Sequence, residues 1–392
     1  MRLLVLSFYF PPDLSAGSFR THHLVQALLQ IAPHCEITVV TTAPNRYHSF
    51  RSAASARDDI GRLHVRRIEL PPHRGGFVAQ SRAFAAYAAR GWGLTARCEC
   101  DAVFATSSRL MTAVLGAAVA RGLGVPLYLD IRDIFVDTMA DVLPRPVSTA
   151  LRPAFTTLES FAIGTAASVN LVSQGFLPYF HRRYPGQRYT TFTNGIDPEF
   201  LTPLPPPASG PPGRPLRVVY AGNIGDGQGL HTILPDLAHR LAGRVEFEVI
   251  GDGGRRADLE HAVHAAGCSN VVIREPVPRD QLRAAYATAD VLFLHLNDYD
   301  AFAKVLPSKI FEYAATGRPI WAGVRGHAGD FLRREVPNAS VFHPCDALGA
   351  VEALERLQLG LVPRTEFVAR YGRESICRRM AADILAVVQR AE

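Results

Sequence analysis

The chain contains only two lysines, Lys304 and Lys309, and both lie in the segment AKVLPSKIFEYAATGRP, residues 303–319. The other forty basic residues are arginines, an excess that a preference for GC-rich codons would explain. Such a preference accounts for one surviving lysine better than for two in one short segment. Because the lysine ammonium is a compact charge on a flexible stem, it suits a phosphate in a confined place. The segment is therefore a candidate anion-binding site.

Three glycine clusters, at 15–18 (SAGS), 221–229 (AGNIGDGQG) and 251–254 (GDGG), are further candidates for phosphate binding. Glycine lets backbone N–H groups approach a phosphate, and the N-terminus of a following helix adds positive potential. No cluster combines the G-x-G-x-x-G spacing with an acidic residue about 20 positions later, which argues against a dinucleotide site.

The elements that must position these residues are strands and helices in alternation. Continuous apolar runs such as RLLVLSFYF (2–10) and LRVVYAG (216–222) are separated by amphipathic segments, a pattern typical of parallel sheets covered by helices on both faces. Residues 202–215 contain seven prolines and read as a semi-rigid linker. We therefore expect an α/β protein with two Rossmann-like, doubly wound domains, and ligands in such sheets bind at the carboxyl ends of the strands. The predicted parts are an N-terminal domain at 1–200, a linker at 201–215, a C-terminal domain at 216–365, and a terminal helix at 366–392 that packs across the domain junction.

The composition is that of a globular protein, with 48% hydrophobic and 20% charged residues in 392. No segment has the roughly 18 apolar residues of a membrane span. The apolar start MRLLVLSFYF is followed at once by PPD and no clear cleavage site, so we interpret it as a buried strand rather than a signal sequence. The six cysteines form no metal-ligand pattern, which predicts reduced thiols in a cytosolic protein.

The net charge of +6 lies in the first half of the chain, where residues 1–200 have 20 basic and 14 acidic side chains. Segment 62–97 has seven arginines, one acidic residue and several aromatic residues, a combination that suits an anionic membrane surface. An amphipathic core helix with a solvated arginine face is the alternative. No nucleic-acid-binding motif is recognisable. The expected membrane contacts are Arg66, Arg67, Arg74, Arg82 and Arg90.

Taken together, several stretches resemble the family-4 retaining glycosyltransferases of the GT-B fold over nearly the whole chain. They are FYFPPDLSAGSFR, IRDIFVDT, FTNGID, YAGNIGDGQGL, VIGDGGRR, PVPRDQLRAAYATADV and PSKIFEYAATGRPI. Within this family the chain is most similar to bacterial enzymes of O-antigen and capsule synthesis, the fucosaminyl-type amino-sugar transferases.

The resemblance implies roles for the matching positions. Gly17 and Ser18 correspond to a loop at the donor diphosphate, Gly251 and Asp252 to the nucleotide side, and Val277 to backbone that reads the base. Glu312 matches the acid that holds the donor ribose. Asp133, next to Arg132, lies in a strand-end loop that faces the sugar and the acceptor. The predicted donor site also includes Gly222, Asn223, Gln228, Lys304 and Ser308.

This chain differs from the family pattern at several positions of the donor site, and these differences bear on the role of the lysines. Many members have an arginine and a lysine on the diphosphate where this chain has Asn223 and Gln228, both neutral. Many also have a sugar-contacting acid at the position of Lys304, and an active-site histidine where Ser107 and Ser108 occur. We therefore predict that Lys309 supplies the missing charge, as a catalytic group that neutralises the leaving diphosphate. A surface ion pair of Lys309 with Glu312 is the alternative, worth about half a kcal/mol.

The predicted function is transfer of a sugar, with retention of configuration, from a UDP-linked donor to a lipid-diphosphate-linked glycan at the cytoplasmic face of the plasma membrane. The motif DYD (298–300) resembles the D-x-D metal site of the other large glycosyltransferase fold. Its place in a GT-B-like second domain favours a solvated loop, and we expect neither a metal nor another cofactor. The alternatives are a non-hydrolysing UDP-sugar 2-epimerase and an inactive scaffold that binds sugar nucleotides.

Overall fold

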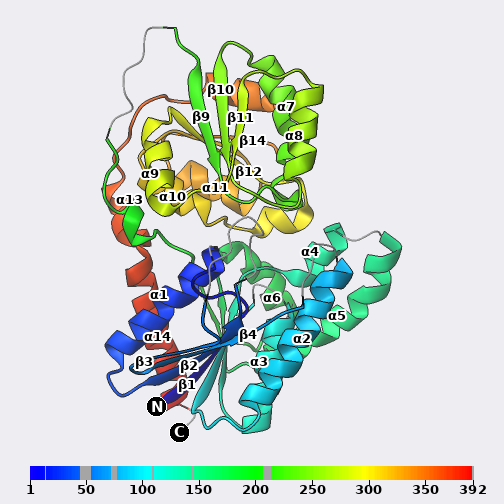
Figure 1. Ribbon diagram of the computed structural model, residues 1–392, viewed down its shortest axis with the longest axis vertical. Helices are drawn as coiled ribbons and strands as arrows, with labels where there is room; N and C mark the ends of the chain where they lie inside the picture. The colour runs from blue at the N-terminus through cyan, green and yellow to red at the C-terminus, as the bar shows by residue number, and fades with distance from the viewer. Residues whose placement is uncertain are drawn as a thin grey trace. The chain divides into compact units, whose positions relative to one another are not determined.

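The computed structural model describes residues 1–13, 15–44, 54–71, 77–107, 110–142, 145–205 and 213–390. The chain forms two compact units (Figure 1). Unit 1 comprises Met1–Asn194 and Arg373–Glu392, and unit 2 comprises Gly195–Gly372.

Unit 1 is built on an eight-stranded sheet of order β3-β4-β2-β1-β5-β6-β7-β8, in which β3 alone is antiparallel to its neighbour. Helices α1 and α14 cover one face, and α2, α3 and α5 lie on the other (Figure 1). The strands are β1 (Arg2–Ser7), β2 (Glu36–Thr42), β3 (Arg57–Ile60), β4 (Leu63–Ile68), β5 (Ala102–Ser107), β6 (Leu127–Ile131), β7 (Ser168–Leu171) and β8 (Tyr189–Thr190). The helices are α1 (Ala16–Ile31), α2 (Phe77–Thr95), α3 (Leu110–Leu123), α4 (Phe135–Val142), α5 (Arg145–Thr165), α6 (Leu177–Arg183) and α14 (Arg373–Gln389).

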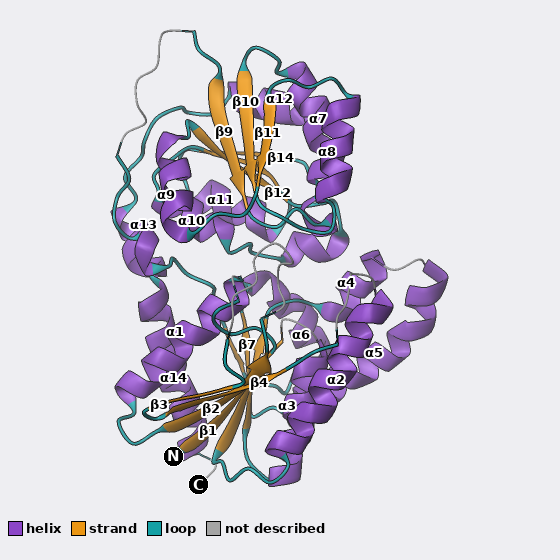
Figure 2. Cartoon of the chain, viewed as in Figure 1, coloured by secondary structure: helices purple, strands orange, loops and turns teal. Residues whose placement is uncertain are grey.

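Unit 2 is built on a six-stranded, wholly parallel sheet of order β11-β10-β9-β12-β13-β14 (Figure 2). One apolar core lies between this sheet and α9–α11, and a second lies between the sheet and α7, α8 and α12. The strands are β9 (Leu216–Ala221), β10 (Val245–Ile250), β11 (Val271–Arg274), β12 (Val291–His295), β13 (Ile320–Gly323) and β14 (Ala339–Phe342). The helices are α7 (Leu230–Arg240), α8 (Arg256–Ala265), α9 (Arg279–Thr288), α10 (Lys309–Ala315), α11 (His327–Glu335), α12 (Ala347–Glu355) and α13 (Thr365–Tyr371).

The predicted alternation of buried strands and helices is confirmed. The apolar start of the chain is the buried strand β1, paired in parallel with β2 and β5. This pairing places the carboxyl ends of β1, β5 and β6 at one edge of the sheet in unit 1. In unit 2, the ends of β9, β10 and β12 meet in the same way.

The units divide the chain at positions other than the predicted ones. The predicted single helix at 366–392 is two helices, α13 and α14, which are separated at Gly372 and belong to different units. Helix α14 joins unit 1 because Cys377, Met380 and Ile384 are buried in the core between α1 and the sheet. No described helix is long and apolar enough to cross a bilayer.

Candidate functional site

The glycine turns after β9 and β10 pack against each other in unit 2. A Cβ atom on Gly251 would lie 1.8 Å from the carbonyl oxygen of Gly222, and one on Gly253 would lie 2.4 Å from that of Ile224. The backbone N–H of Ile224 donates to the carbonyl of Asp252, 2.9 Å away. Any larger residue would push the two turns apart, so these glycines are required for the close approach of backbone to backbone.

Lys309 is the first residue of α10 and reaches the turn after β9. Its Nζ lies 2.6 Å from the hydroxyl of Tyr220 and 4.0 Å from the centre of that ring. A Cβ atom on Gly222 would come within 2.2 Å of the same Nζ. Burial lowers the pKa of Lys309 to about 7, with the charge of Glu312 acting in the opposite direction. The ammonium therefore lies over Gly222. The loop that follows begins at Asn223 and ends at Gln228, and both of these residues are neutral.

The loop that follows Gly222 is fixed by side chains from the end of β12. Asn223 donates its amide to the side-chain oxygen of Gln228 at 2.7 Å. His295, which is buried, contacts the carbonyl of Gln228 through Nδ1 at 2.7 Å, and Asn297 donates to the carbonyl of Asp226 at 2.9 Å. Burial lowers the pKa of His295 to about 4, against the effect of its bond to Gln228. The imidazole is thus neutral near pH 7 and serves to hold the loop.

Glu312 is paired with Arg279, whose Nη1 lies 3.3 Å from the carboxylate. The other end of the same guanidinium contacts Asp197, and it lies 5.3 Å from the centre of the Phe200 ring. Arg279 and Tyr220 were missed as site residues by sequence reasoning, although both lie within the stretches that carried the family resemblance. A charged residue at the start of a predicted helix was the available signal for Arg279.

The remaining predicted donor residues are Ser308, Lys304 and Val277, which precede α10 or α9 in the chain. Ser308 immediately precedes α10 in a helical conformation and makes no side-chain capping bond. Lys304 ends the 3₁₀ turn Asp300–Lys304. Val277 is partly buried and packs on the core that includes α10, between β11 and α9.

The two aspartates of DYD are bound by an arginine. Arg325 donates its Nε to Asp298 and its Nη2 to Asp300, both at 2.7 Å. Across the described ranges, no three His, Cys, Asp or Glu residues gather in a way that could hold a metal ion. The guanidinium thus satisfies the charges that a divalent cation would otherwise balance.

In unit 1, Gly17 and Ser18 lie in the first turn of α1, whose N-cap is Ser15. The Arg132 guanidinium lies so close that a Cβ atom on Gly17 would be 2.0 Å from its Nη1. The hydroxyl of Ser18 is fully buried and has no hydrogen-bond partner in the part of the chain that the structure describes. Gly17, Ser18 and Arg132 therefore form a second polar group at the carboxyl edge of a sheet.

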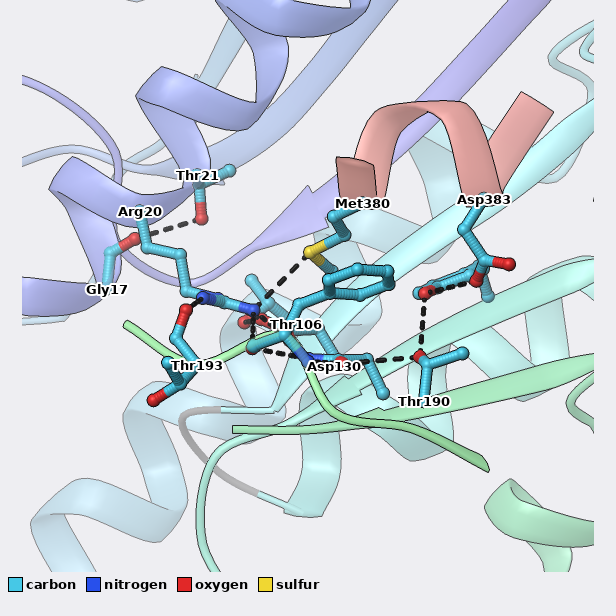
Figure 3. A network of polar contacts seen from close by, with 12 residues as sticks. Gly17, Arg20, Thr21, Thr106, Asp130, Thr190, Thr193, Met380 and Asp383 are labelled. Carbon is cyan, nitrogen blue, oxygen red and sulfur yellow. Dashed lines mark hydrogen bonds and ion pairs between the residues drawn. The ribbon is translucent and has the colours of Figure 1, made fainter. Parts of the chain in front are cut away.

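A buried ion pair between Arg20 and Asp130 lies near this group in unit 1 (Figure 3). Arg20, one turn further along α1, donates to both oxygens of Asp130, at 2.9 and 3.0 Å, and to the carbonyls of Phe192 and Thr193. Asn170 donates to the same carboxylate at 2.7 Å. Burial alone would raise the pKa of Asp130, but the charge and hydrogen bonds of Arg20 lower it overall.

Asp133 lines a crevice of unit 1 whose walls come from β5, β6 and helices α3 to α6. The crevice also contains Ser107 and Glu159, and its other lining residues are Leu110, Ala113, Ile131, Phe135, Ala162, Ile163 and Phe180. Glu159 is buried and accepts hydrogen bonds from the hydroxyls of Tyr179 and Tyr184 at 3.0 and 2.9 Å. Burial raises the pKa of the Glu159 carboxyl, with both hydroxyls acting in the opposite direction. Ser108 lies outside the described residues.

The arginines expected at a membrane are not alike. Arg66 and Arg67 lie on strand β4 rather than on a helix, and they are paired with Asp59 and Asp58. The Arg67 side chain is only 7% exposed, so it is not a lipid contact. Arg90 on α2 donates to the carbonyl of Glu69, and Arg82 on the same helix is exposed. Arg74 lies outside the described residues.

The structure thus brings the predicted residues together in two groups, one in each unit. Gly222, Asn223, Gln228, Gly251 and Lys309 surround one pair of turns in unit 2. Gly17, Ser18 and Arg132 are neighbours in unit 1, and Asp133 lies next to Arg132 in the chain.

The C-terminal part of the chain matches a known protein family. Residues 215–358 match the family described as glycosyl transferases group 1. Among curated protein sequences, none matches this chain.

Similar solved structures span the whole chain. They include a sucrose-phosphate synthase from Thermosynechococcus elongatus (TM-score 0.76, 13% identity, 100% of both chains covered). The apo lipopolysaccharide outer core galactosyltransferase WaaB is similar too (TM-score 0.65, 11% identity, covering 98% of this chain and 99% of that one). So is HepE of Anabaena in complex with UDP and glucose (TM-score 0.61, 16% identity, covering 100% of this chain and 98% of that one). The fold is that of the GT-B proteins.

Proposed function

We propose that this chain is a glycosyltransferase that moves a sugar from a nucleotide diphosphate to an acceptor. The observation that carries the proposal is the Lys309 ammonium over the Gly222 turn, inside the region that matches group 1 glycosyl transferases. Sugar transfer releases a nucleotide diphosphate, and a preorganised cation stabilises the charge that develops on it as the glycosidic bond breaks. Lys309 supplies the positive charge that Asn223 and Gln228, which are neutral, do not provide.

The donor is a UDP-linked sugar in this proposal, since HepE was solved with UDP and glucose. The diphosphate lies at the Gly222 and Gly251 turns, beside the Lys309 ammonium. The ribose hydroxyls donate to Glu312, whose orientation Arg279 fixes. Backbone at Val277 contacts the base, and Lys304 faces the sugar.

The reaction is front-side substitution with retention of configuration. The acceptor oxygen forms the new bond to the anomeric carbon, the bond from that carbon to the diphosphate oxygen breaks, and the acceptor proton passes to the departing diphosphate. The chain then supplies orientation and charge rather than a nucleophile. Asp133 positions the acceptor hydroxyl or assists in taking its proton. Asp133 is exposed and therefore accessible to an acceptor.

The acceptor is a lipid-diphosphate-linked glycan, and the enzyme works peripherally at the cytoplasmic face of the membrane. The lipopolysaccharide substrate named for WaaB and the positive charge of residues 1–200 support this part of the proposal. Because Arg66 and Arg67 already have carboxylate partners, the exposed side of α2 is the remaining candidate surface, with Arg82 and the 43%-exposed Trp92.

The membrane contact is tested with vesicles that contain anionic lipid. Arg82→Gln combined with Trp92→Gln should weaken binding several-fold at low salt, and added salt should weaken binding of the parental protein. Arg66→Gln is the matched control, since it removes a charge of the same unit that already has a partner. Equal binding by all three proteins would contradict this surface.

The activity itself is tested by incubating the protein with a panel of UDP-sugars and a lipid-linked glycan. Transfer of sugar to the lipid phase supports the proposal. Epimerised nucleotide sugar would identify a 2-epimerase instead, and binding of the nucleotide sugar without either product would identify a scaffold.

A further inference from the structure

Tyr220 is the residue that holds the charge of Lys309 in place. It lies near the end of β9, is 1% exposed, and donates its single hydroxyl hydrogen to the carbonyl of Asn223 at 2.6 Å. The same oxygen must therefore accept the hydrogen bond from the Lys309 Nζ, 2.6 Å away. This gives a chain of two hydrogen bonds that runs from Lys309 through Tyr220 to the backbone of the turn.

The partner of Lys309 is thus a neutral phenol. Among the described residues, the Lys309 Nζ contacts the hydroxyl and the ring face of Tyr220. A phenol fixes the direction of the ammonium and its ring face attracts the cation, but it does not neutralise the charge. A carboxylate in this place would compete with an incoming anion.

We propose that Tyr220 positions the Lys309 ammonium over the Gly222 turn, and that binding of a nucleotide diphosphate there is coupled to uptake of a proton by Lys309. The inference rests on the proposed function, because it takes the diphosphate of a nucleotide sugar as the ligand. It adds a positioning residue and a pH dependence that the function alone does not require.

The groups around Lys309 determine the sign of this effect. Tyr220 faces it from β9 and Glu312 from its own helix α10, while Arg279 on α9 is paired with that glutamate. Burial lowers the pKa of Lys309 to about 7, so part of the free protein has a neutral amine near neutral pH. A bound diphosphate favours the charged form and raises this pKa. Binding near neutral pH therefore takes up protons, and the uptake is larger at pH 8 than at pH 7.

Removal of the Tyr220 hydroxyl has a predicted direction. Tyr220→Phe keeps the ring but takes away the acceptor of the ammonium, so the pKa of Lys309 falls further. The affinity of the variant for a diphosphate then begins to decline at a lower pH than that of the parent. The ratio of the two dissociation constants should be small at pH 6 and grow to about tenfold near pH 8. A loss of packing alone would give the same ratio at every pH.

The experiment is calorimetric titration with UDP-glucose at pH 6, 7 and 8, in pairs of buffers that differ in ionisation enthalpy. UDP-glucose is the chosen probe because it lacks the terminal phosphate group that titrates near pH 6. The variants are Tyr220→Phe and Lys309→Arg. The matched control is Tyr87→Phe, which removes another buried hydroxyl that donates to a carbonyl, that of Val40, in unit 1. Thermal unfolding checks that each protein is folded.

The proposal expects proton uptake by the parent and by Tyr87→Phe, no uptake by Lys309→Arg, and a pH profile displaced towards acid in Tyr220→Phe. Tight binding by the parent without proton uptake would overturn the coupling and leave the proposed function intact. A ratio between Tyr220→Phe and the parent that is constant with pH would overturn the role of Tyr220. No binding of UDP-glucose by the parent would overturn the proposed function and this inference with it.

Discussion

The contacts of Lys309 allow the effect of its replacement to be worked out in detail. Lys309→Met keeps the apolar stem against Gly222 and Tyr220 and removes only the charge. Two unit charges about 4 Å apart attract by roughly 4 kcal/mol at the effective dielectric of a partly buried site. With a pKa of about 7, the amine must first gain a proton at pH 8, which reduces this attraction by about 1.4 kcal/mol.

The net loss of between 2 and 3 kcal/mol, by the same order-of-magnitude argument, corresponds to about a hundredfold in rate. Because the charge on the diphosphate grows as the glycosidic bond breaks, the loss should appear mainly in kcat and less in the KM for the donor. Lys309→Arg should restore the rate only in part, since the wider guanidinium needs more room over the Gly222 turn.

The assay is steady-state transfer with the true donor, at pH 6.5 and pH 8, for the parent and the Met, Ala and Arg variants of Lys309. The thermal unfolding midpoint of each variant excludes loss of fold as the cause. A kcat for Lys309→Ala close to that of the parent would refute the reasoning and return both lysines to codon preference.

Further predictions concern the neighbouring charges. Activity should survive EDTA, and Asp298→Asn with Asp300→Asn should keep most of it, because these carboxylates are bound to an arginine; complete loss with EDTA and recovery with manganese would contradict this. Glu312→Gln should weaken UDP binding without altering the choice of sugar, whereas Lys304→Ala should alter that choice, most strongly for a sugar with a carboxylate; competition between donors measures both effects. Arg20→Met should lower the free energy of unfolding by about 3–5 kcal/mol, since it leaves a buried carboxylate without its counter-ion; a change below 1 kcal/mol in denaturant titration would count against a buried ion pair.

The strands that form the two sheets could be predicted because they are buried on both faces. The expected runs RLLVLSFYF and LRVVYAG contain β1 and β9, and β9 and β10 end where glycine follows the apolar run. The edge hairpin of β3 and β4 was missed, because three of the four residues of RDDI are charged and LHVRRI was read as part of the basic segment 62–97. The structure pairs Arg66 and Arg67 of this hairpin with Asp59 and Asp58, partners that the sequence analysis did not assign.

Residues of the candidate site could be predicted only where a local feature of the sequence marks them. Lys309 was found because its residue type is rare in this chain, and Gly222 and Gly251 because they follow strands. Tyr220 could not be assigned from the sequence, since its partner lies 89 positions away and the sheet alone brings them together. The same holds for Arg325, which approaches DYD from 25 residues further along the chain.

A single spectroscopic measurement tests the claim that Lys309 faces the donor diphosphate. With ¹⁵N-lysine incorporated, the protein has only two side-chain amine resonances, and Lys304→Ala assigns them. Titration with pH should give the Lys309 resonance a pKa of about 7 in the free protein, and saturating UDP-sugar should raise that pKa by two units or more, about the shift expected for an opposite charge at close range. A resonance that titrates near the ordinary lysine value of about 10.4, and that does not move when the nucleotide sugar binds, would contradict the account.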